Sequence, residues 1–169
     1  MKLIDPKKII SENVFEEIGN KWMLITSGEK ENFNTMTASW GAEGVLWNKN
    51  VSFIFVRPQR YTFEFLEKSD FYSLSFFDFK YREKLLYCGR NSGREVDKIK
   101  NSGLTPVFKE EVPYFKEAEK VMICKKIYSD FLNPECFKDK LLDQNYENKD
   151  YHKMYVGEIL KCLMRDENE

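Results

Sequence analysis

The stretch VSFIFVR, residues 51–57, constrains the fold more than any other part of this sequence. It is almost wholly apolar and rich in β-branched and aromatic side chains, which favour β-strands. Such a run is typical of a strand that is buried on both faces. Pro58 follows at once, and proline has no N–H to donate to a neighbouring strand. We therefore predict a buried strand that ends at Arg57.

Further β-prone stretches cover residues 21–28, 71–77, about 118–131 and about 151–163. Helices are predicted at 59–70, at 80–89 with Gly89 as the stop, and from the capping-box pair Ser92 and Glu95 to just before Gly103. Residues 133–145 are expected to form a loop with a helical turn, and the charged tail 165–169 is expected to fray. Because strands and helices do not alternate regularly, the pattern disfavours a doubly wound parallel sheet. It favours a mainly β fold, an antiparallel barrel or sandwich with inserted helices.

The length and charge of the chain exclude several classes of protein. A chain of 169 residues is expected to form one domain, 1–169. Its 27 basic and 28 acidic residues lack the basic excess that is typical of nucleic-acid-binding proteins. No apolar run approaches the roughly 20 residues of a membrane span, and MKLIDPKKII lacks the apolar core of a signal peptide. We therefore expect a cytoplasmic protein that binds neither nucleic acid nor membranes.

Four cysteines and one histidine limit the metal and nucleophile chemistry of the chain. Cys88, Cys124, Cys136 and Cys162 form no CxxC pair, whereas zinc ligands usually come in close pairs. We therefore expect no metal site and mostly buried, reduced thiols. His152 is the single base for a Ser/His/Asp or Cys/His mechanism, and no GxSxG elbow is present. No GxGxxG or P-loop motif supports nucleotide binding by those folds.

Hydroxyl side chains alternate with packing side chains in NTMTASWG, residues 34–41. In an extended segment, successive side chains point to opposite sides. One face would then carry Thr35, Thr37 and Ser39, and the other would carry Asn34, Met36, Ala38 and Trp40. The hydroxyl face suits either an oxygen-rich ligand or bulk water.

The segment VRPQRYT places Arg57, Arg60 and Thr62 at a predicted strand-to-helix junction. The free N–H groups of a helix N-terminus attract phosphate, and arginine adds a bidentate fork. The alternative is a solvated turn with surface arginines. Aromatic residues likewise have two interpretations, as the walls of a planar-cofactor site or as plain core; these are Trp40, Trp47, Phe76, Phe77 and Tyr81.

Four blocks of the sequence go beyond such patterns. They are NTMTASWGAEGVLWNK, RPQRYTFEFLEKSDFYSLSFF, CGRNSGREVDKIKNSGLTP and HKMYVGEI. In this order and spacing they resemble the flavin reductase-like, FMN-binding split-barrel family, and most closely its flavoredoxin-type branch. The resemblance covers about residues 21–163.

The resemblance implies a homodimer of split β-barrels that binds FMN non-covalently near the dimer interface. It implies that 34–40 contact the flavin ring and ribityl chain, and that Arg57, Arg60 and Thr62 lie at the phosphate. SLSFF and SGRE would approach the cofactor from the other side, and the hydroxyl face of 34–40 would meet the ribityl phosphate. The implied cofactor-binding residues are Asn34, Thr35, Met36, Thr37, Ala38, Ser39, Trp40, Arg57, Arg60, Thr62, Phe76 and Ser92.

A flavin carries the electron chemistry itself, so few catalytic side chains are needed. The resemblance implies either a flavin reductase that uses NADH or NADPH, or a flavoredoxin-like carrier between redox protein partners. Many NAD(P)H-dependent members carry Gly-Asp-His near the last strands, whereas this chain has NKDYHKMYVGEI. His152 is therefore only a weak catalytic candidate. The alternatives are a non-catalytic module for flavin or another planar ligand, and, less favoured, an enzyme of the pyridoxamine-phosphate-oxidase type.

Overall fold

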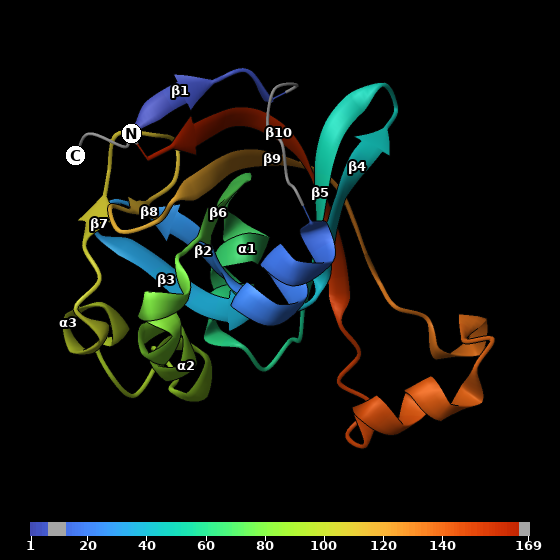
Figure 1. Cartoon of the computed structure of the whole chain (residues 1–169). Coiled ribbons are helices and arrows are strands. Elements are labelled where there is room, and N and C mark those ends of the chain that lie inside the picture. Colours follow the sequence, from blue (N-terminus) through green and yellow to red (C-terminus); the bar gives the residue numbers. More distant parts are fainter. Residues whose placement is uncertain (7–12, 166–169) are drawn as a thin grey trace.

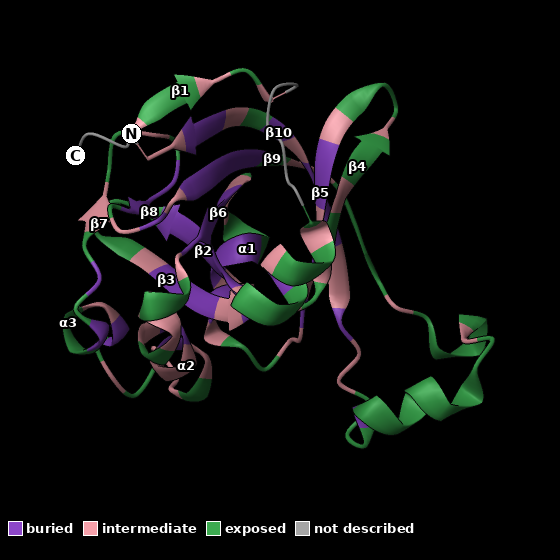
Figure 2. Cartoon of the chain, viewed as in Figure 1, coloured by how far each residue is buried: buried purple, intermediate pink, exposed green. Residues whose placement is uncertain are grey.

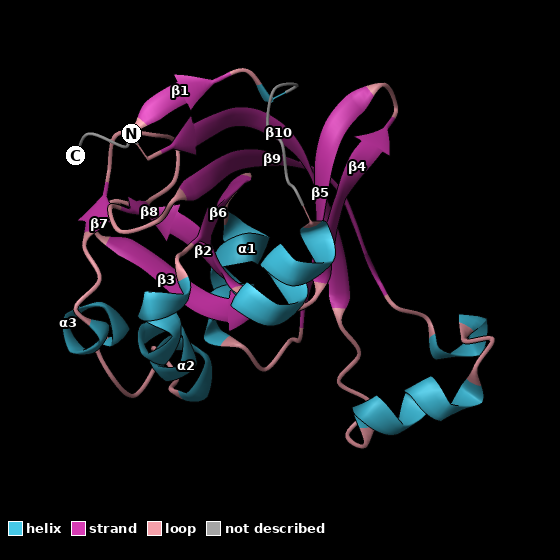
Figure 3. Cartoon of the chain, viewed as in Figure 1, coloured by secondary structure: helices cyan, strands magenta, loops and turns pink. Residues whose placement is uncertain are grey.

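The computed structural model describes residues 1–6 and 13–165 of the chain, so the predicted fraying of 166–169 lies outside the described residues. The fold is mainly β (Figures 1 and 3). The strands are β1 (Lys2–Ile4), β2 (Met23–Glu29), β3 (Asn32–Ala38), β4 (Gly41–Leu46), β5 (Lys49–Val56), β6 (Phe71–Phe76), β7 (Pro106–Val107), β8 (Tyr114–Phe115), β9 (Lys120–Phe131) and β10 (Lys153–Met164). The α-helices are α1 (Tyr61–Lys68), α2 (Arg82–Arg90) and α3 (Lys98–Ser102). A π-helix covers Phe15–Lys21, and 3₁₀-helices cover Phe79–Tyr81, Pro134–Cys136 and Lys140–Tyr146.

One antiparallel sheet forms the body of the protein, in the order β3-β2-β6-β9-β10-β5-β4. Strand β10 has the most partners, because it pairs with β9, β5 and β1 along its length. A separate two-stranded sheet joins β7 to β8. The prediction of an antiparallel, mainly β fold with inserted helices is therefore confirmed.

Both faces of the sheet are covered, because alternate residues of each central strand join different hydrophobic clusters. In β9, Met122 and Cys124 belong to one cluster, whereas Val121 and Ile123 belong to the other. The first cluster also takes Leu66 from α1. The second cluster receives side chains from α2 and from the segment around β8. Period-two alternation between two apolar layers explains why these strands are rich in hydrophobic residues on both sides.

Three sequence-based expectations need correction. Strand β5 is not buried on both faces, because Phe53 and Phe55 are only half-buried and Phe55 lines a cavity. Gly89 does not stop α2, which continues to Arg90; a Cβ at Gly89 would lie 3.2 Å from Thr37 Cβ, so this glycine allows α2 to approach β3. Ser92 starts a turn rather than a helix, since the N-cap of α3 is Asp97.

A buried polar contact crosses the barrel between β6 and β5. The Tyr72 hydroxyl lies 2.7 Å from Ser52 Oγ, and both residues are fully buried. Gly157 follows an irregularity in the β9–β10 pairing and faces this hydroxyl. A Cβ at Gly157 would lie 2.2 Å from the Tyr72 oxygen, so no larger residue fits there.

Residues 132–152, here called the arm, extend away from the barrel between β9 and β10 (Figure 1). Most of the arm is exposed, in contrast to the buried central strands (Figure 2). The β4–β5 hairpin also projects from the body, and β4 forms one end of the sheet.

Within the described residues, no helix is long and apolar enough to cross a membrane. The same residues contain no cluster of His, Cys, Asp and Glu suited to a metal ion. Cys88, Cys124 and Cys162 are buried free thiols, as predicted, and Cys136 is exposed on the arm.

Candidate functional site

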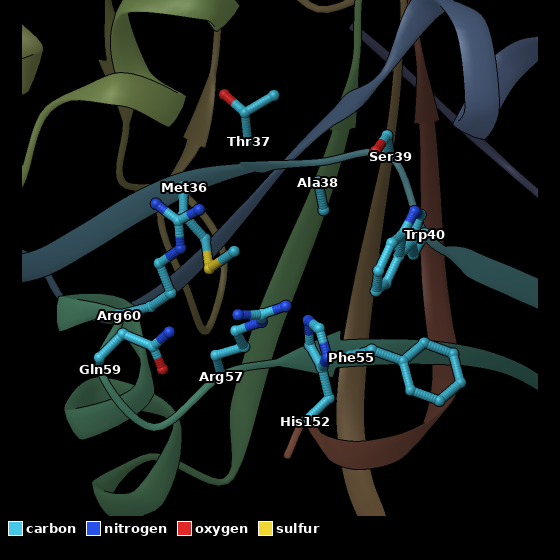
Figure 4. A pocket seen from close by; sticks show the side chains of 10 residues that line it. All are labelled: Met36, Thr37, Ala38, Ser39, Trp40, Phe55, Arg57, Gln59, Arg60 and His152. Atoms are coloured by element: carbon cyan, nitrogen blue, oxygen red, sulfur yellow. The ribbon is translucent and has the colours of Figure 1, made fainter. Parts of the chain in front are cut away.

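The cavity that collects most of the predicted site residues, here called the main cavity, lies between the end of β3 and the end of β5. Its volume is about 390 Å³. The lining combines apolar and aromatic side chains with two arginines and the single histidine (Figure 4); the residues are Met36, Thr37, Ala38, Ser39, Trp40, Phe55, Arg57, Gln59, Arg60 and His152. Such a mixture of apolar side chains and a few polar groups is typical of small-molecule sites.

The packing face of β3, rather than its hydroxyl face, is directed into this cavity. Figure 4 shows Met36 and Ala38 pointing toward the arginines, while Thr37 points away. The Thr37 hydroxyl donates to the Leu85 carbonyl of α2. The Thr35 hydroxyl is fully buried and lies 3.0 Å from Thr26 Oγ1. The expectation of a hydroxyl face for the ligand is therefore corrected at these two threonines, because α2 and β2 already occupy that side.

A second, basic cavity of about 170 Å³ continues from the main cavity, with which it shares Met36, Gln59 and Arg60. It lies at the first turn of α1, where no side chain caps the free N–H groups. Its other lining residues are Tyr61, Thr62, Arg90, Asn91, Ser92 and Lys98. Arginines, a lysine and an uncapped helix N-terminus together favour an anion here.

Lys98 is the most unusual residue of the basic cavity, since its side chain is a buried cation. It is 6% exposed, and its Nζ donates to the carbonyls of Thr35 (2.9 Å) and Cys88 (2.8 Å). Burial, with a smaller contribution from the nearby Arg60, lowers the pKa of Lys98 from 10.5 to about 8. Among residues 1–6 and 13–165, no carboxylate pairs with Arg60, Arg90 or Lys98. A buried cation without a counter-charge is costly, so this cavity is suited to a bound anion.

Arg57 connects the main cavity to the arm rather than to the basic cavity. Its guanidinium donates to Asp150 Oδ2 (3.0 Å) and to the Asn145 carbonyl (2.7 Å). It also lies 5.1 Å from the centre of the Tyr146 ring. Gln59 donates to the same Asp150 oxygen. These contacts attach the C-terminal part of the arm, which contains Asn145 and Asp150, to the cavity wall.

His152 stands where the arm joins β10, and 8% of it is exposed. Its ring centre lies 5.0 Å from that of Trp40, and its Nδ1 lies 2.8 Å from the Tyr146 hydroxyl. Burial lowers the pKa of His152 to about 4, and the guanidinium of Arg57 acts in the same direction. The imidazole is therefore neutral at physiological pH.

Comparison with known proteins identifies the family of the chain. Residues 15–169 match the model of the flavin reductase like domain. The chain belongs to this family. A search of curated proteins found no sequence match.

Solved structures share the fold at low sequence identity. Flavoredoxin from Methanosarcina acetivorans is 22% identical, with a TM-score of 0.67 over 86% of this chain and 69% of that one. An FMN-binding protein from Thermus thermophilus is 18% identical, with a TM-score of 0.69 over 99% and 83%. A protein from Shewanella frigidimarina, described as a flavin reductase with a split barrel domain, is 16% identical, with a TM-score of 0.68 over 95% and 77%. The chain therefore has the split-barrel fold.

Within this family fold, most of the residues implied by the resemblance gather at the two cavities. Residues 36–40, Arg57 and Arg60 line the main cavity, and Thr62 and Ser92 line the basic one. Three implied residues line neither. Thr35 is bonded inside the protein, Asn34 is buried with its amide donating to Thr62 Oγ1 (2.7 Å), and Phe76 is 3% exposed in the core beneath Lys120. Phe76 packs into the core cluster on its face of β6, and its contact with a ligand stays a prediction.

The sequence interpretation missed Lys98, Arg90 and Phe55. Lys98 lies in a five-residue helix, which is too short for a periodic pattern to mark its buried face. Ser102, four residues later, is buried on the same helix, and this polar i, i+4 pair was the only available signal.

Proposed function

We propose that this chain, as one split-barrel domain spanning 1–169, binds FMN non-covalently and acts as a flavin reductase-like oxidoreductase. The observation that carries the proposal is the pair of joined cavities. One is lined partly by apolar and aromatic side chains, as a ring system requires, and the other holds cations that no described carboxylate neutralises, as a phosphate dianion requires. FMN carries a ring system at one end and a phosphate at the other. Membership of the family and the FMN-binding relatives support the same ligand.

The residues fit the parts of this ligand in a definite way. Arg60, Lys98 and Ser92 would hold the phosphate together with the first-turn N–H groups of α1. Met36, Ala38 and Trp40 would pack against the ring, while Arg57 and Arg60 add positive charge to the cavity. When bound, the flavin supplies the hydride and electron transfer chemistry itself. The protein's share is to bind it, orient it and favour the negative charge of its reduced form.

The proposed reaction has an electron donor and an acceptor. NADH or NADPH is the proposed donor, with free flavin or a redox protein as the acceptor. The proposed setting is cytoplasmic, and the active form is a homodimer, which would cover the exposed aromatic residues Trp40 and Trp47. Steady oxidation of NADH or NADPH with added flavin would identify a reductase. Its absence, with reduction by a protein partner, would identify a carrier.

Titration with FMN tests the cofactor assignment. The purified protein is stripped of ligand, FMN is added, and the dissociation constant is measured by flavin fluorescence. Arg60→Ala and Lys98→Met should each weaken binding by roughly 10- to 100-fold, since each removes a charge-assisted contact of about 1.5–3 kcal/mol. Lys100→Met is the matched control, because Lys100 lies on the same helix but is exposed. A colourless protein that takes up no FMN would refute the proposal.

A further inference from the structure

A separate cavity lies beside β7 and β8, on the opposite side of the molecule from the arm (Figure 1). Its volume is about 650 Å³, and it shares no residue with the main cavity or the basic cavity. We call it the β7–β8 cavity. Half of its lining is apolar or aromatic and half is cationic, and none of the described residues that line it is acidic; the residues are Met1, Val107, Lys109, Tyr114, Lys116 and Arg165.

The apolar wall of this cavity is built on the short β7–β8 sheet. Val107 and Tyr114 are paired across the two strands, so their side chains lie on the same face of this sheet. Tyr114 is 6% exposed, and it belongs to the second hydrophobic cluster, against which Val107 and Met1 also pack. The wall is therefore firmly connected to the core, and it offers apolar surface that the hydrocarbon part of a ligand can cover.

The Tyr114 hydroxyl is an unused hydrogen-bond donor in this wall. It has no partner among residues 1–6 and 13–165, although the side chain is more than nine-tenths buried. Its oxygen is not sealed in the core, so it is open to the cavity that Tyr114 lines. Burial, and next the carboxylate of Glu110, raise the pKa of Tyr114, so the hydroxyl keeps its proton at neutral pH. Because an unpaired donor is costly, this O–H favours an acceptor within the cavity.

The three cations of the cavity lack a counter-charge. In the part of the chain that the structure describes, no carboxylate lies within ion-pair distance of Lys109, Lys116 or Arg165. The Arg165 guanidinium is held by one donated hydrogen bond, from Nη2 to the Glu117 carbonyl (3.2 Å). Its position is thus fixed at one nitrogen, and the rest of the fork is available for a ligand.

The acidic side chains of the neighbouring segment are engaged with other groups. Glu110 and Glu111 both pair with Lys161, at 2.7 and 2.9 Å. The Glu117 carboxylate accepts from the Thr105 backbone N–H at 3.0 Å. These carboxylates do not pair with the cations of the cavity. A hollow lined by charge of one sign attracts a ligand of the opposite sign, so the β7–β8 cavity favours an anion.

We propose that the β7–β8 cavity is a second ligand site, which binds an amphipathic carboxylic acid. A carboxylate offers two acceptor oxygens, one for the Tyr114 hydroxyl and one for the Arg165 guanidinium, and the two lysines add positive charge. The hydrocarbon body of the acid would lie on Met1, Val107 and the tyrosine ring. A volume of about 650 Å³ is within the range of small-molecule sites. Because this cavity is separate from the other two, the proposal does not rest on the flavin function.

Calorimetric titration of the full chain with octanoate tests the site. Octanoate carries both a carboxylate and an apolar body, so it should bind at least tenfold more tightly than 1-octanol or acetate, which each lack one of them. Arg165→Met should weaken octanoate binding tenfold or more, because it removes a charge-assisted contact, and Tyr114→Phe should weaken it roughly three- to tenfold. Lys116→Met should weaken it roughly two- to fivefold, and this side chain is exposed, so its loss leaves the fold intact. Tyr128→Phe is the matched control, because the Tyr128 hydroxyl is bonded to Asp130 on the surface (3.2 Å).

Equal binding of 1-octanol, unchanged affinity in Tyr114→Phe, or no heat at high octanoate concentration would each overturn the proposal. A loss of affinity in Arg60→Ala instead would place octanoate in the basic cavity, and this would also overturn it. A full chain that carries Asp166→Asn, Glu167→Gln and Glu169→Gln is titrated in parallel, since these carboxylates follow Arg165 in the sequence. Octanoate binding by this variant alone would refute a separate ligand, because the chain's own carboxylates would then be the anions of the cavity.

Discussion

Lys98 should make the ligand-free protein more stable as the pH rises above neutrality. Its pKa in the folded state is lowered to about 8 by burial, from 10.5 when exposed. Between these two values the unfolded chain binds more protons than the folded one, so the free energy of unfolding increases with pH. Below pH 8 both states carry the proton, and the full cost of the buried charge remains.

The size of this effect follows from the same two values. A difference from 10.5 to 8 corresponds to about 3 kcal/mol at 1.36 kcal/mol per pH unit. Integrated from pH 7 to pH 9.5, it amounts to about 2 kcal/mol of added stability. Lys98→Met removes this contribution. It also leaves the Thr35 and Cys88 carbonyls without the lysine donor, which destabilises the variant. The free energies of unfolding of the wild-type and Lys98→Met proteins at pH 7 therefore differ less than the charge alone suggests.

The assay is urea unfolding of the stripped protein at several pH values, for the wild-type and Lys98→Met proteins in parallel. All other titrating groups are common to both chains, so the difference between their pH profiles reports Lys98 together with its coupling to the neighbouring Cys88 thiol. We expect the wild-type profile to rise by about 2 kcal/mol relative to the variant between pH 7 and 9.5. Parallel profiles would show that Lys98 titrates normally and that the basic cavity is not a site of uncompensated charge.

Three further predictions concern packing, the arm and β3. Gly157→Ala should lower the free energy of unfolding by about 2–3 kcal/mol, because the new Cβ meets the Tyr72 hydroxyl; urea unfolding measures this, with Gly44→Ala, which has nothing within 4 Å, as the control. Arg57→Ala should release the arm and raise tryptic cleavage within 132–152 roughly five- to thirtyfold. The control Arg94→Ala breaks an ion pair with Glu64 and should leave this cleavage unchanged. Equal cleavage of the wild-type and Arg57→Ala proteins would refute the attachment. Thr37→Val should leave the FMN dissociation constant within about twofold, because the Thr37 hydroxyl donates to α2; a larger loss would restore the hydroxyl face as a ligand contact.

The strands were predicted well because the central strands are rich in apolar and β-prone side chains. The run at 51–57 and the stretches near 118–131 and 151–163 all appear as strands β5, β9 and β10. The helix boundaries at Gly89 and Ser92 were wrong, since a glycine and a capping pattern each have a second use. Gly89 permits a close approach between helix and strand, and Ser92 starts a turn.

Most of the predicted site residues gather at the two cavities, but which face of 34–40 meets them was not predicted. Alternation along 34–40 fixes which side chains share a face, but only tertiary packing decides which face a helix covers. Here α2 covers the threonines, so the packing face meets the cavity. Lys98 was missed for a related reason. Its side chain reaches the carbonyl of Thr35, which is distant in sequence, and no local pattern records that contact.

Strand β4 has a consequence for how the protein behaves in concentrated solution. It ends the sheet, its Val45 is 74% exposed, and a Cβ at Gly44 would meet nothing within 4 Å. Its outward backbone N–H and C=O groups can template the addition of a strand from another molecule. A second chain laid along β4 would block this growth, whereas isolated chains would be prone to edge-to-edge aggregation. A charge introduced at Val45 is the smallest change that would interrupt such stacking, because a lysine on an edge strand discourages pairing.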